Sequence, residues 1–338
     1  MLTERKSLLI KRFTSFSMLL VLLTHNVITS DTFLGDVFYV LVFRTFTRIA
    51  VPVFFAVSSF LLFHNYNYTK IWKRTKTLFF PFIIWSVISY CIFAVFPLLP
   101  FLKPFFNTSV SLTISGFVES VFISPKNGSL WFLRDLYILV LLSPIIQILL
   151  RFKKISYFLC VSLAVIWLGD LNYSFMVESA FFFFLGALIA NNLFFWDKEA
   201  ASNRCAYLCI ILYAVFLCAC SYISVNYSIN PMIITKISIL IGLPLLLYVK
   251  KLFLVETVLT RFLDWFKKYS FFLFVTNSII LSFTKKMLIN LMPPTHFYTA
   301  ILLYFVSFVL LLVIGCGLQR ILYQYTPNFL KILTGNRI

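Results

Sequence analysis

Residues 299–319 read TAILLYFVSFVLLLVIGCGLQ, twenty-one residues in succession without a charged side chain. A helical run of about 20 apolar residues matches the thickness of the hydrocarbon core of a bilayer. Hydrophobic residues make up 61% of the 338-residue chain and charged residues only 12%. In soluble domains roughly 25% of the residues are charged, because the whole surface of the domain is in contact with water. The sequence therefore predicts an integral membrane protein, and it excludes a soluble nucleic-acid-binding domain.

Ten such runs follow one another along the chain, and each is predicted to form a membrane-spanning helix. The runs are continuous and do not alternate between apolar and polar residues, which favours an all-α helical bundle. We expect a single membrane domain over residues 1–338. Its spans are predicted near residues 13–29, 37–63, 78–97, 131–150, 155–170, 174–195, 205–223, 233–249, 269–284 and 299–319.

The positive charges indicate the orientation of these spans. The chain has 29 Lys and Arg against 11 Asp and Glu, for a formal net charge of +18. If the N-terminus is cytoplasmic, inside segments hold twenty-one of these cations and outside loops only four. Cytoplasmic loops of membrane proteins are enriched in Lys and Arg. We therefore predict that both termini are cytoplasmic and that the basic segments also attract anionic membrane lipid.

Two further features bear on the outer face and on metals. The longest outside connection, residues 98–130, contains a short apolar stretch at Leu112–Ile123, which is interpreted as an interfacial or re-entrant piece or as an ordinary loop helix. The seven cysteines show no zinc-type spacing, and no His, Asp and Glu cluster has the spacing of metal ligands. No metal is expected.

Function is sought among ionisable groups at membrane depth, because each is costly there unless it is paired or faces a cavity. His25 is predicted in the outer half of the first helix, at a depth that overlaps Arg44 and Arg48 on the second. Arg134 and Asp135 are expected just below the outer boundary on the fourth helix, and Glu178 enters the sixth from outside. If the helices bundle, these groups converge on a polar cavity in the outer half.

Each residue also has a simpler explanation. A single His in a helix is often a packing residue, and an Arg near a helix end can extend its charged group to the interface. Arg134 and Asp135 can form a structural ion pair. The residues alone therefore indicate a polar site, which fits a transporter, a glycan polymerase or an acyltransferase equally well.

Six segments give the chain a resemblance to the acyltransferase 3 family of integral membrane O-acyltransferases, over residues 13–319. The family's short, stand-alone members are the nearest in organisation. The segments are SMLLVLLTHN (Ser17–Asn26), RIAVPVFFAVSSFLLF (Arg48–Phe63), KRTKTLFFPF (Lys73–Phe82), LWFLRDLYILVLLSP (Leu130–Pro144), FFFFLGALIA (Phe181–Ala190) and SFFLFVTNSIIL (Ser270–Leu281).

The chain departs from the family's pattern at several positions. Family members usually have an Arg eleven residues before the first-helix His, where this chain has Thr14, with Arg12 two residues away. The ninth helix has Phe274 and Asn277 where a Tyr and a His are common. These changes favour an altered acceptor or an inactive relative.

The resemblance implies transfer of an acyl group, usually acetyl from cytosolic acetyl-CoA, to a hydroxyl of a glycan. A neutral His is a suitable base for an alcohol near pH 7, so His25 is expected to deprotonate the acceptor or to carry the acyl group. Asp135 is expected to orient the imidazole or the sugar, and Arg48 and Arg134 to stabilise the oxyanion. Substrate contacts are assigned to Arg44, Trp131, Glu178 and Asn277, and phosphate contacts to Lys70, Lys73, Arg74 and Lys76.

Two other functions remain open. A carrier or flippase can move a lipid-linked sugar or an anion past the same arginines, and a non-catalytic partner can serve a polysaccharide assembly complex. The basic loop has an alternative explanation too, because any inside loop tends to be basic. The expected partners are a glycan or lipid-linked sugar and membrane lipid, with no nucleic acid. A multi-pass location in a bacterial inner membrane is expected, and the sequence is compatible with a homo-oligomer.

Overall fold

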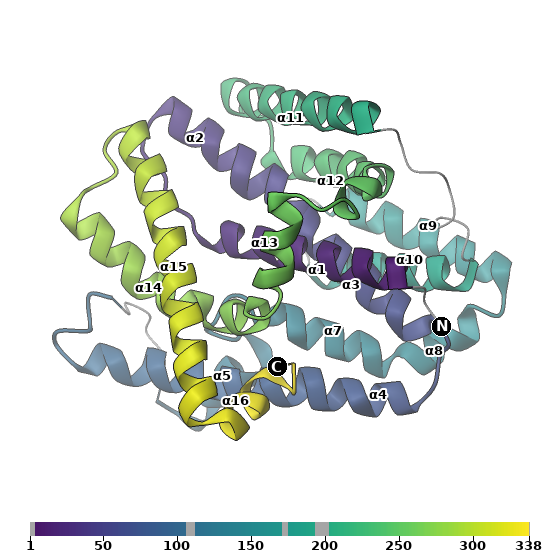
Figure 1. Cartoon of the computed structure of the whole chain (residues 1–338), viewed down its shortest axis with the longest axis horizontal. Helices are drawn as coiled ribbons and strands as arrows, with labels where there is room; N and C mark the ends of the chain where they lie inside the picture. Colours follow the sequence, from purple (N-terminus) through teal and green to yellow (C-terminus); the bar gives the residue numbers. More distant parts are fainter. Residues whose placement is uncertain (1–3, 106–111, 171–174, 193–202, 338) are drawn as a thin grey trace. The chain divides into compact units, whose positions relative to one another are not determined.

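The computed structural model describes residues 4–105, 112–170, 175–192 and 203–337, and within these ranges it contains helices and no strand (Figure 1). This confirms the predicted all-α bundle. The α-helices are α1 (Glu4–His25), α2 (Phe33–Tyr39), α3 (Ala50–Phe63), α4 (Thr69–Arg74), α5 (Phe80–Val95), α6 (Ile114–Val118), α7 (Trp131–Leu141), α8 (Ser143–Leu149), α9 (Lys153–Gly169), α10 (Phe175–Asn192), α11 (Asn203–Asn226), α12 (Pro231–Tyr248), α13 (Val258–Phe266), α14 (Ser270–Leu291), α15 (Phe297–Tyr325) and α16 (Pro327–Thr334).

Each of the ten predicted spans coincides with a helix or a run of helices. Seven helical stretches in the described residues are long and apolar enough to cross a membrane. The pair α7 and α8 passes the same test as one unit, but a bend of 53° separates its two parts. The seven stretches are Glu4–His25, Phe33–Phe63, Thr69–Leu98, Asn203–Asn226, Pro231–Tyr248, Ser270–Leu291 and Phe297–Tyr325.

Two of the long helical stretches and the short helix Ile114–Ile123 change their winding before a proline. π-Helical turns occupy Val40–Thr45, Thr75–Phe79 and Glu119–Ile123, and a 3-10 turn occupies Phe46–Ile49. Pro52, Pro81 and Pro125 follow these turns. Proline has no N–H to donate and its ring crowds the preceding turn, so the regular i→i−4 ladder is interrupted at these places. Arg44 and Arg48 lie on either side of such a change, so the regular i,i+4 spacing predicted for them does not hold.

The chain divides into two compact units, and each draws on segments that are far apart in sequence. The first unit contains residues 1–24, 36–70 and 139–267, and the second contains residues 25–35, 71–138 and 268–338.

In the first unit α3 packs closely against α10. A Cβ atom added at Gly186 of α10 would lie 2.2 Å from the carbonyl oxygen of Ala56, so only glycine permits this approach. Small residues allow such contacts between helices in a membrane, where dispersion forces drive association. The aromatic side chains Phe55, Phe182 and Phe183 are buried around this crossing.

In the second unit α14 and α15 lie side by side (Figure 1). Ile28, which follows α1, packs with Ala300 and Leu303 of α15 and with Leu288 of α14. α16 folds back from the end of α15 and packs on α5. The second unit therefore brings the end of α1, the helix α14 and the last described residues into one packed body.

Candidate active site

His25 is the last residue of α1, and the residue after it fixes its backbone. Asn26 has no exposed surface, and its Nδ2 donates to the carbonyl oxygen of Tyr304 at 2.7 Å. The hydroxyl of Ser307 donates to Asn26 Oδ1, also at 2.7 Å. Both polar groups of the amide are thus satisfied by α15. Buried hydrogen bonds of this kind hold a backbone segment in one position, so Asn26 fixes the place from which His25 extends.

Lys285 contacts the same end of α1. Its Nζ donates to the carbonyl oxygen of His25 at 3.2 Å, and its side chain is half-buried. Lys285 and Lys286 are two of the four cations counted on the outer side, and both belong to α14, which continues to Leu291 beyond the predicted span 269–284. The long aliphatic stem of a lysine allows it to continue a membrane helix while its ammonium group reaches a polar partner. A positive charge therefore lies next to the backbone of the predicted base.

The start of α7 carries the ion pair that the sequence suggested. Arg134 Nε and Nη2 each lie 2.9 Å from Asp135 Oδ1, and Asp135 has no exposed surface. Arg134 also donates from Nη1 to the carbonyl oxygen of Ile123. The carboxylate of Asp135 is therefore paired with the guanidinium of Arg134, and Arg134 also links the start of α7 to the preceding π-helical turn.

A buried loop before α7 is attached to α14. Asn127 Nδ2 donates to the carbonyl oxygen of Val275 at 2.6 Å. Asn277 and Ser129 form a buried hydrogen-bonded pair, with Asn277 Nδ2 2.8 Å and Asn277 Oδ1 3.0 Å from Ser129 Oγ. The side chain of Asn277 was assigned to substrate binding. Its contacts fasten the loop that precedes Trp131 and the ion pair, and the predicted substrate contact stays a prediction.

Tyr137, near the middle of α7, lies beside the basic segment. The ring of Tyr137 stacks on Phe79 with centroids 4.8 Å apart, and its hydroxyl lies 3.3 Å from Thr75 Oγ1. Thr75 follows Arg74 directly and lies near the predicted cytoplasmic end of its span. The hydrogen bonds of the loop 124–130 to Val275 and Asn277 place the start of α7 beside the first half of α14. The depth of Arg134 and Asp135 in the membrane stays a prediction.

The four predicted phosphate ligands have different surroundings. Lys73 and Lys76 are exposed, and the Lys76 ammonium lies 5.4 Å from the centroid of the Trp72 ring. Lys70 Nζ donates to the carbonyl oxygens of Leu61, Leu62 and His64, at 3.1, 3.2 and 2.5 Å. These are the last carbonyls of α3, which have no helical donor. Lys70 therefore caps α3, and its ammonium is occupied by the protein.

The remaining predicted residues belong to the first unit. Arg44 lies over the ring of Tyr39 at 5.4 Å, and its buried Nε has no hydrogen-bond partner among the described residues. Arg48 belongs to the 3-10 turn before α3. Glu178 is 1% exposed and accepts a hydrogen bond from Trp167 Nε1 at 3.3 Å.

A buried lysine completes the surroundings of Glu178. Lys236 of α12 is 4% exposed and donates to the carbonyl oxygens of Trp167 at 2.6 Å, Leu168 at 3.2 Å and Asp170. Its ammonium satisfies the last carbonyls of α9 and balances the charge of Glu178. These contacts give Glu178 a structural role, and its substrate contact stays a prediction.

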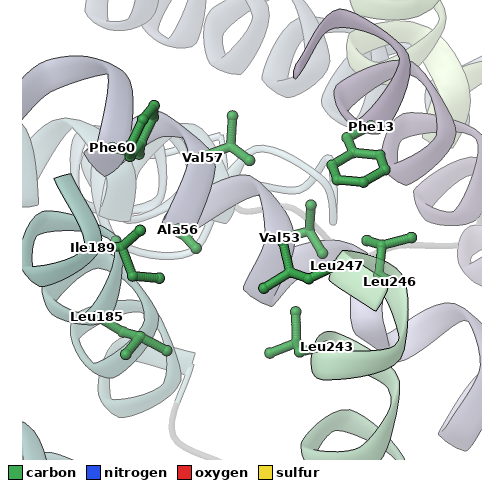
Figure 2. Close-up of a pocket in the computed structure, with 11 residues that line it drawn as sticks. Phe13, Val53, Ala56, Val57, Phe60, Leu185, Ile189, Leu243, Leu246 and Leu247 are labelled. Atoms are coloured by element: carbon green, nitrogen blue, oxygen red, sulfur yellow. The ribbon is translucent and has the colours of Figure 1, made fainter. Parts of the chain in front are cut away.

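The first unit also contains a cavity of about 100 Å³ between α1, α3, α10 and α12 (Figure 2). Phe13 and Leu246 lie on one side of it and Phe60 and Leu185 on the other, with Val53 between them (Figure 2). The lining residues are apolar throughout, so this space offers neither a base nor an oxyanion donor. In the described part of the chain, no three His, Cys, Asp or Glu side chains gather as a metal site.

The predicted residues thus divide between the two units. The second unit contains His25, Trp131, Arg134, Asp135, Asn277, Lys73, Arg74 and Lys76, and the first contains Arg44, Arg48, Glu178 and Lys70. Asn26 and Lys285 were not among the residues predicted for the site. Asn26 directly follows His25 in the segment SMLLVLLTHN, and Lys285 directly follows the predicted span 269–284. Both positions could therefore have been identified from the sequence.

Comparisons with known proteins bear on the whole chain. A family model described as an acyltransferase domain matches residues 15–320. The succinoglycan biosynthesis protein ExoH of Rhizobium meliloti (strain 1021) is 30% identical over 177 residues, which cover 48% of this chain and 47% of that protein. The chain therefore aligns with about half the length of this relative. No solved structure matches the chain.

Proposed function

The chain belongs to the acyltransferase 3 family, and on that premise we propose that it transfers an acyl group, acetyl in the first place, from cytosolic acyl-CoA to a hydroxyl of a cell-surface or lipid-linked glycan. The observation that carries the proposal is the fixed position of His25 at the end of α1, between Asn26 and Lys285. The name of the Rhizobium relative refers to the biosynthesis of a polysaccharide, which supports a glycan acceptor. The proposal includes a bacterial inner membrane as the location of this multi-pass protein.

In the proposed reaction His25 acts as a general base. Its neutral imidazole takes the proton from the acceptor hydroxyl while the oxygen attacks the thioester carbonyl. The carbon–sulfur bond of the tetrahedral intermediate then breaks, and the imidazolium returns the proton to the departing CoA thiolate. The acyl group ends on the glycan oxygen, and no other reactant is needed.

A positive group is assigned to the developing oxyanion. Arg134, which lies in the same unit as His25, is the proposed donor, and fixed donors at a developing negative charge contribute a few kcal/mol in a water-poor site. The partner Asp135 holds the guanidinium of Arg134 in one orientation through two contacts of 2.9 Å. Lys285 donates to the backbone carbonyl oxygen of His25 at 3.2 Å and so helps to fix the residue that carries the imidazole.

The experiment uses membrane vesicles that contain the full chain and radiolabelled acetyl-CoA. Wild-type protein is expected to transfer label to glycan. His25→Gln keeps a hydrogen bond but not basicity, so transfer is expected to fall by about 10²–10⁴-fold. His296→Gln is the matched control, because His296 is exposed and precedes α15 as its cap.

Three results would contradict the proposal. Near-normal turnover of His25→Gln would make His25 a structural residue. Flux of a lipid-linked sugar without incorporation of label would identify a carrier. Wild-type protein without either activity would favour a non-catalytic partner in polysaccharide assembly.

A further inference from the structure

The segment after α15 is firmly attached to α5 within the second unit. Leu330, Leu333 and Thr334 of α16 are buried, at 0, 3 and 2% exposure. Trp85 of α5 donates from its indole Nε1 to the carbonyl oxygen of Leu333 at 2.9 Å. The indole N–H therefore satisfies one of the last carbonyls of α16, which lack a helical donor. This contact fixes the direction in which the chain leaves the helix.

Gly335 turns the chain toward the basic segment. Its φ of +61° lies in the left-handed region that ends many helices and that glycine adopts without strain. An added Cβ atom would lie 2.9 Å from the carbonyl oxygen of Thr77 and 3.0 Å from Pro81 Cγ. Glycine thus allows both the turn and the close approach to the π-helical stretch Thr75–Phe79.

Pro81 leaves the carbonyl oxygen of Thr77 available to Arg337. Its nitrogen carries no hydrogen, so it cannot donate to the carbonyl oxygen of Thr77, four residues earlier. Arg337 Nη2 donates to this oxygen at 2.8 Å. The guanidinium carbon of Arg337 lies 3.8 Å from the centroid of the Phe271 ring. One hydrogen bond and one stacking contact hold the guanidinium and leave most of its five N–H groups available.

Arg74 belongs to the helical stretch that Arg337 contacts: Arg337 Nη2 donates to the carbonyl oxygen of Thr77, and the hydroxyl of Thr77 lies 3.4 Å from the carbonyl oxygen of Arg74. Solvent reaches the Arg337 side chain, yet many protein atoms surround it; this desolvation lowers the pKa of the guanidinium, and the positive charge of Arg74 lowers it further. Neither arginine forms a salt bridge with a carboxylate in the described part of the chain. Two adjacent arginines without an acid repel each other, and an anion between them removes that repulsion.

We propose that Arg337 and Arg74 form a phosphate-binding site at the cytoplasmic end of α5, and, resting on the proposed function, that it receives a phosphate group of CoA. Planar guanidinium groups bind phosphate oxygens in pairs, which suits them to this role. Lys73 and Lys76 flank Arg74 and are exposed, so they add positive charge at the entrance. Anionic lipid carries the same chemical group, and it is the other source to be tested.

The test uses full-length protein in nanodiscs of neutral phosphatidylcholine, with CoA binding measured by calorimetry. R337Q is expected to weaken CoA binding tenfold or more, as the loss of a charge-assisted contact requires. K331Q is the matched control, because Lys331 is an exposed cation on α16, and its affinity is expected to equal that of the wild type. R74Q removes the other guanidinium and is expected to give a loss of the same size, also if R337Q does not fold.

A second arm measures retention of phosphatidylglycerol by the purified variants with mass spectrometry. If R337Q and R74Q bind CoA as the wild type does but retain no phosphatidylglycerol, the phosphate site stands and its ligand is a lipid phosphate. Unchanged binding of both probes in both variants would overturn the site. Wild-type protein that binds no CoA would refute the proposed donor, and the lipid arm would then decide the phosphate site separately.

Discussion

Arg12 and Asp264 provide a quantitative test of the packing within the first unit. Arg12 of α1 is 4% exposed, and its Nε lies 3.1 Å from both carboxylate oxygens of Asp264. Its Nη2 lies 2.6 Å from Oδ2, and its Nη1 donates to the carbonyl oxygen of Phe253 at 2.8 Å. The pair attaches α13 to α1. The two partners differ in exposure, because the side chain of Asp264 is 41% exposed and that of Arg12 only 5%.

This difference predicts unequal effects for the two single substitutions. Asp264→Ala leaves a buried guanidinium with only the Phe253 carbonyl, and removing one partner of a buried pair costs about 3–5 kcal/mol of unfolding free energy. Arg12→Met keeps much of the packed stem and leaves a carboxylate that water can reach, so about 1–2 kcal/mol is expected. The double variant no longer contains a buried unpaired charge, and its loss is expected to be close to that of Arg12→Met alone.

The assay is equilibrium unfolding of purified protein in mixed micelles with increasing SDS, followed by tryptophan fluorescence. Lys11→Met is the control, since it removes an exposed cation one residue away and is expected to change stability little. An Asp264→Ala variant as stable as Arg12→Met, or a double variant whose loss equals the sum of the two, would refute the reasoning. Either result would mean that the pair is hydrated and does not hold α13.

Three further predictions concern the basic segment, Lys70 and the orientation of the chain. Neutralising Lys73 and Arg74 together is expected to raise the apparent KM for acetyl-CoA tenfold or more without loss of insertion. An unchanged KM in this double variant would mean that the basic residues only orient the chain in the membrane. Lys70→Gln is expected to lower thermal stability instead, because Lys70 caps α3. Single-cysteine labelling is expected to find Asn230 outside and Thr69 inside, and outside labelling at Thr69 would overturn the orientation and the phosphate site with it.

Much of the architecture follows from local composition. The length of an apolar run determines whether a helix can cross a bilayer, and this length can be read without knowledge of any neighbour. For this reason seven of the ten predicted spans coincide with helical stretches of the described residues that are long and apolar enough to cross a membrane, including Ser270–Leu291 and Phe297–Tyr325. Charge asymmetry between loops is likewise a property of the sequence, so the orientation is predicted by counting. The quoted segments were also sufficient to suggest the family, which the match over residues 15–320 shows.

The tertiary structure decided the surroundings of the polar side chains. The hydrogen bonds of Asn277 with Ser129, of Lys285 with His25 and of Arg337 with Thr77 join residues 148, 260 and 260 positions apart. A run of apolar residues contains no information about which distant carbonyl is left without a donor. Pro81 removes such a donor from Thr77, and only the folded chain shows that Arg337 replaces it. In a medium without water every polar group must find a partner in the protein, and that partner is set by the packing of the helices.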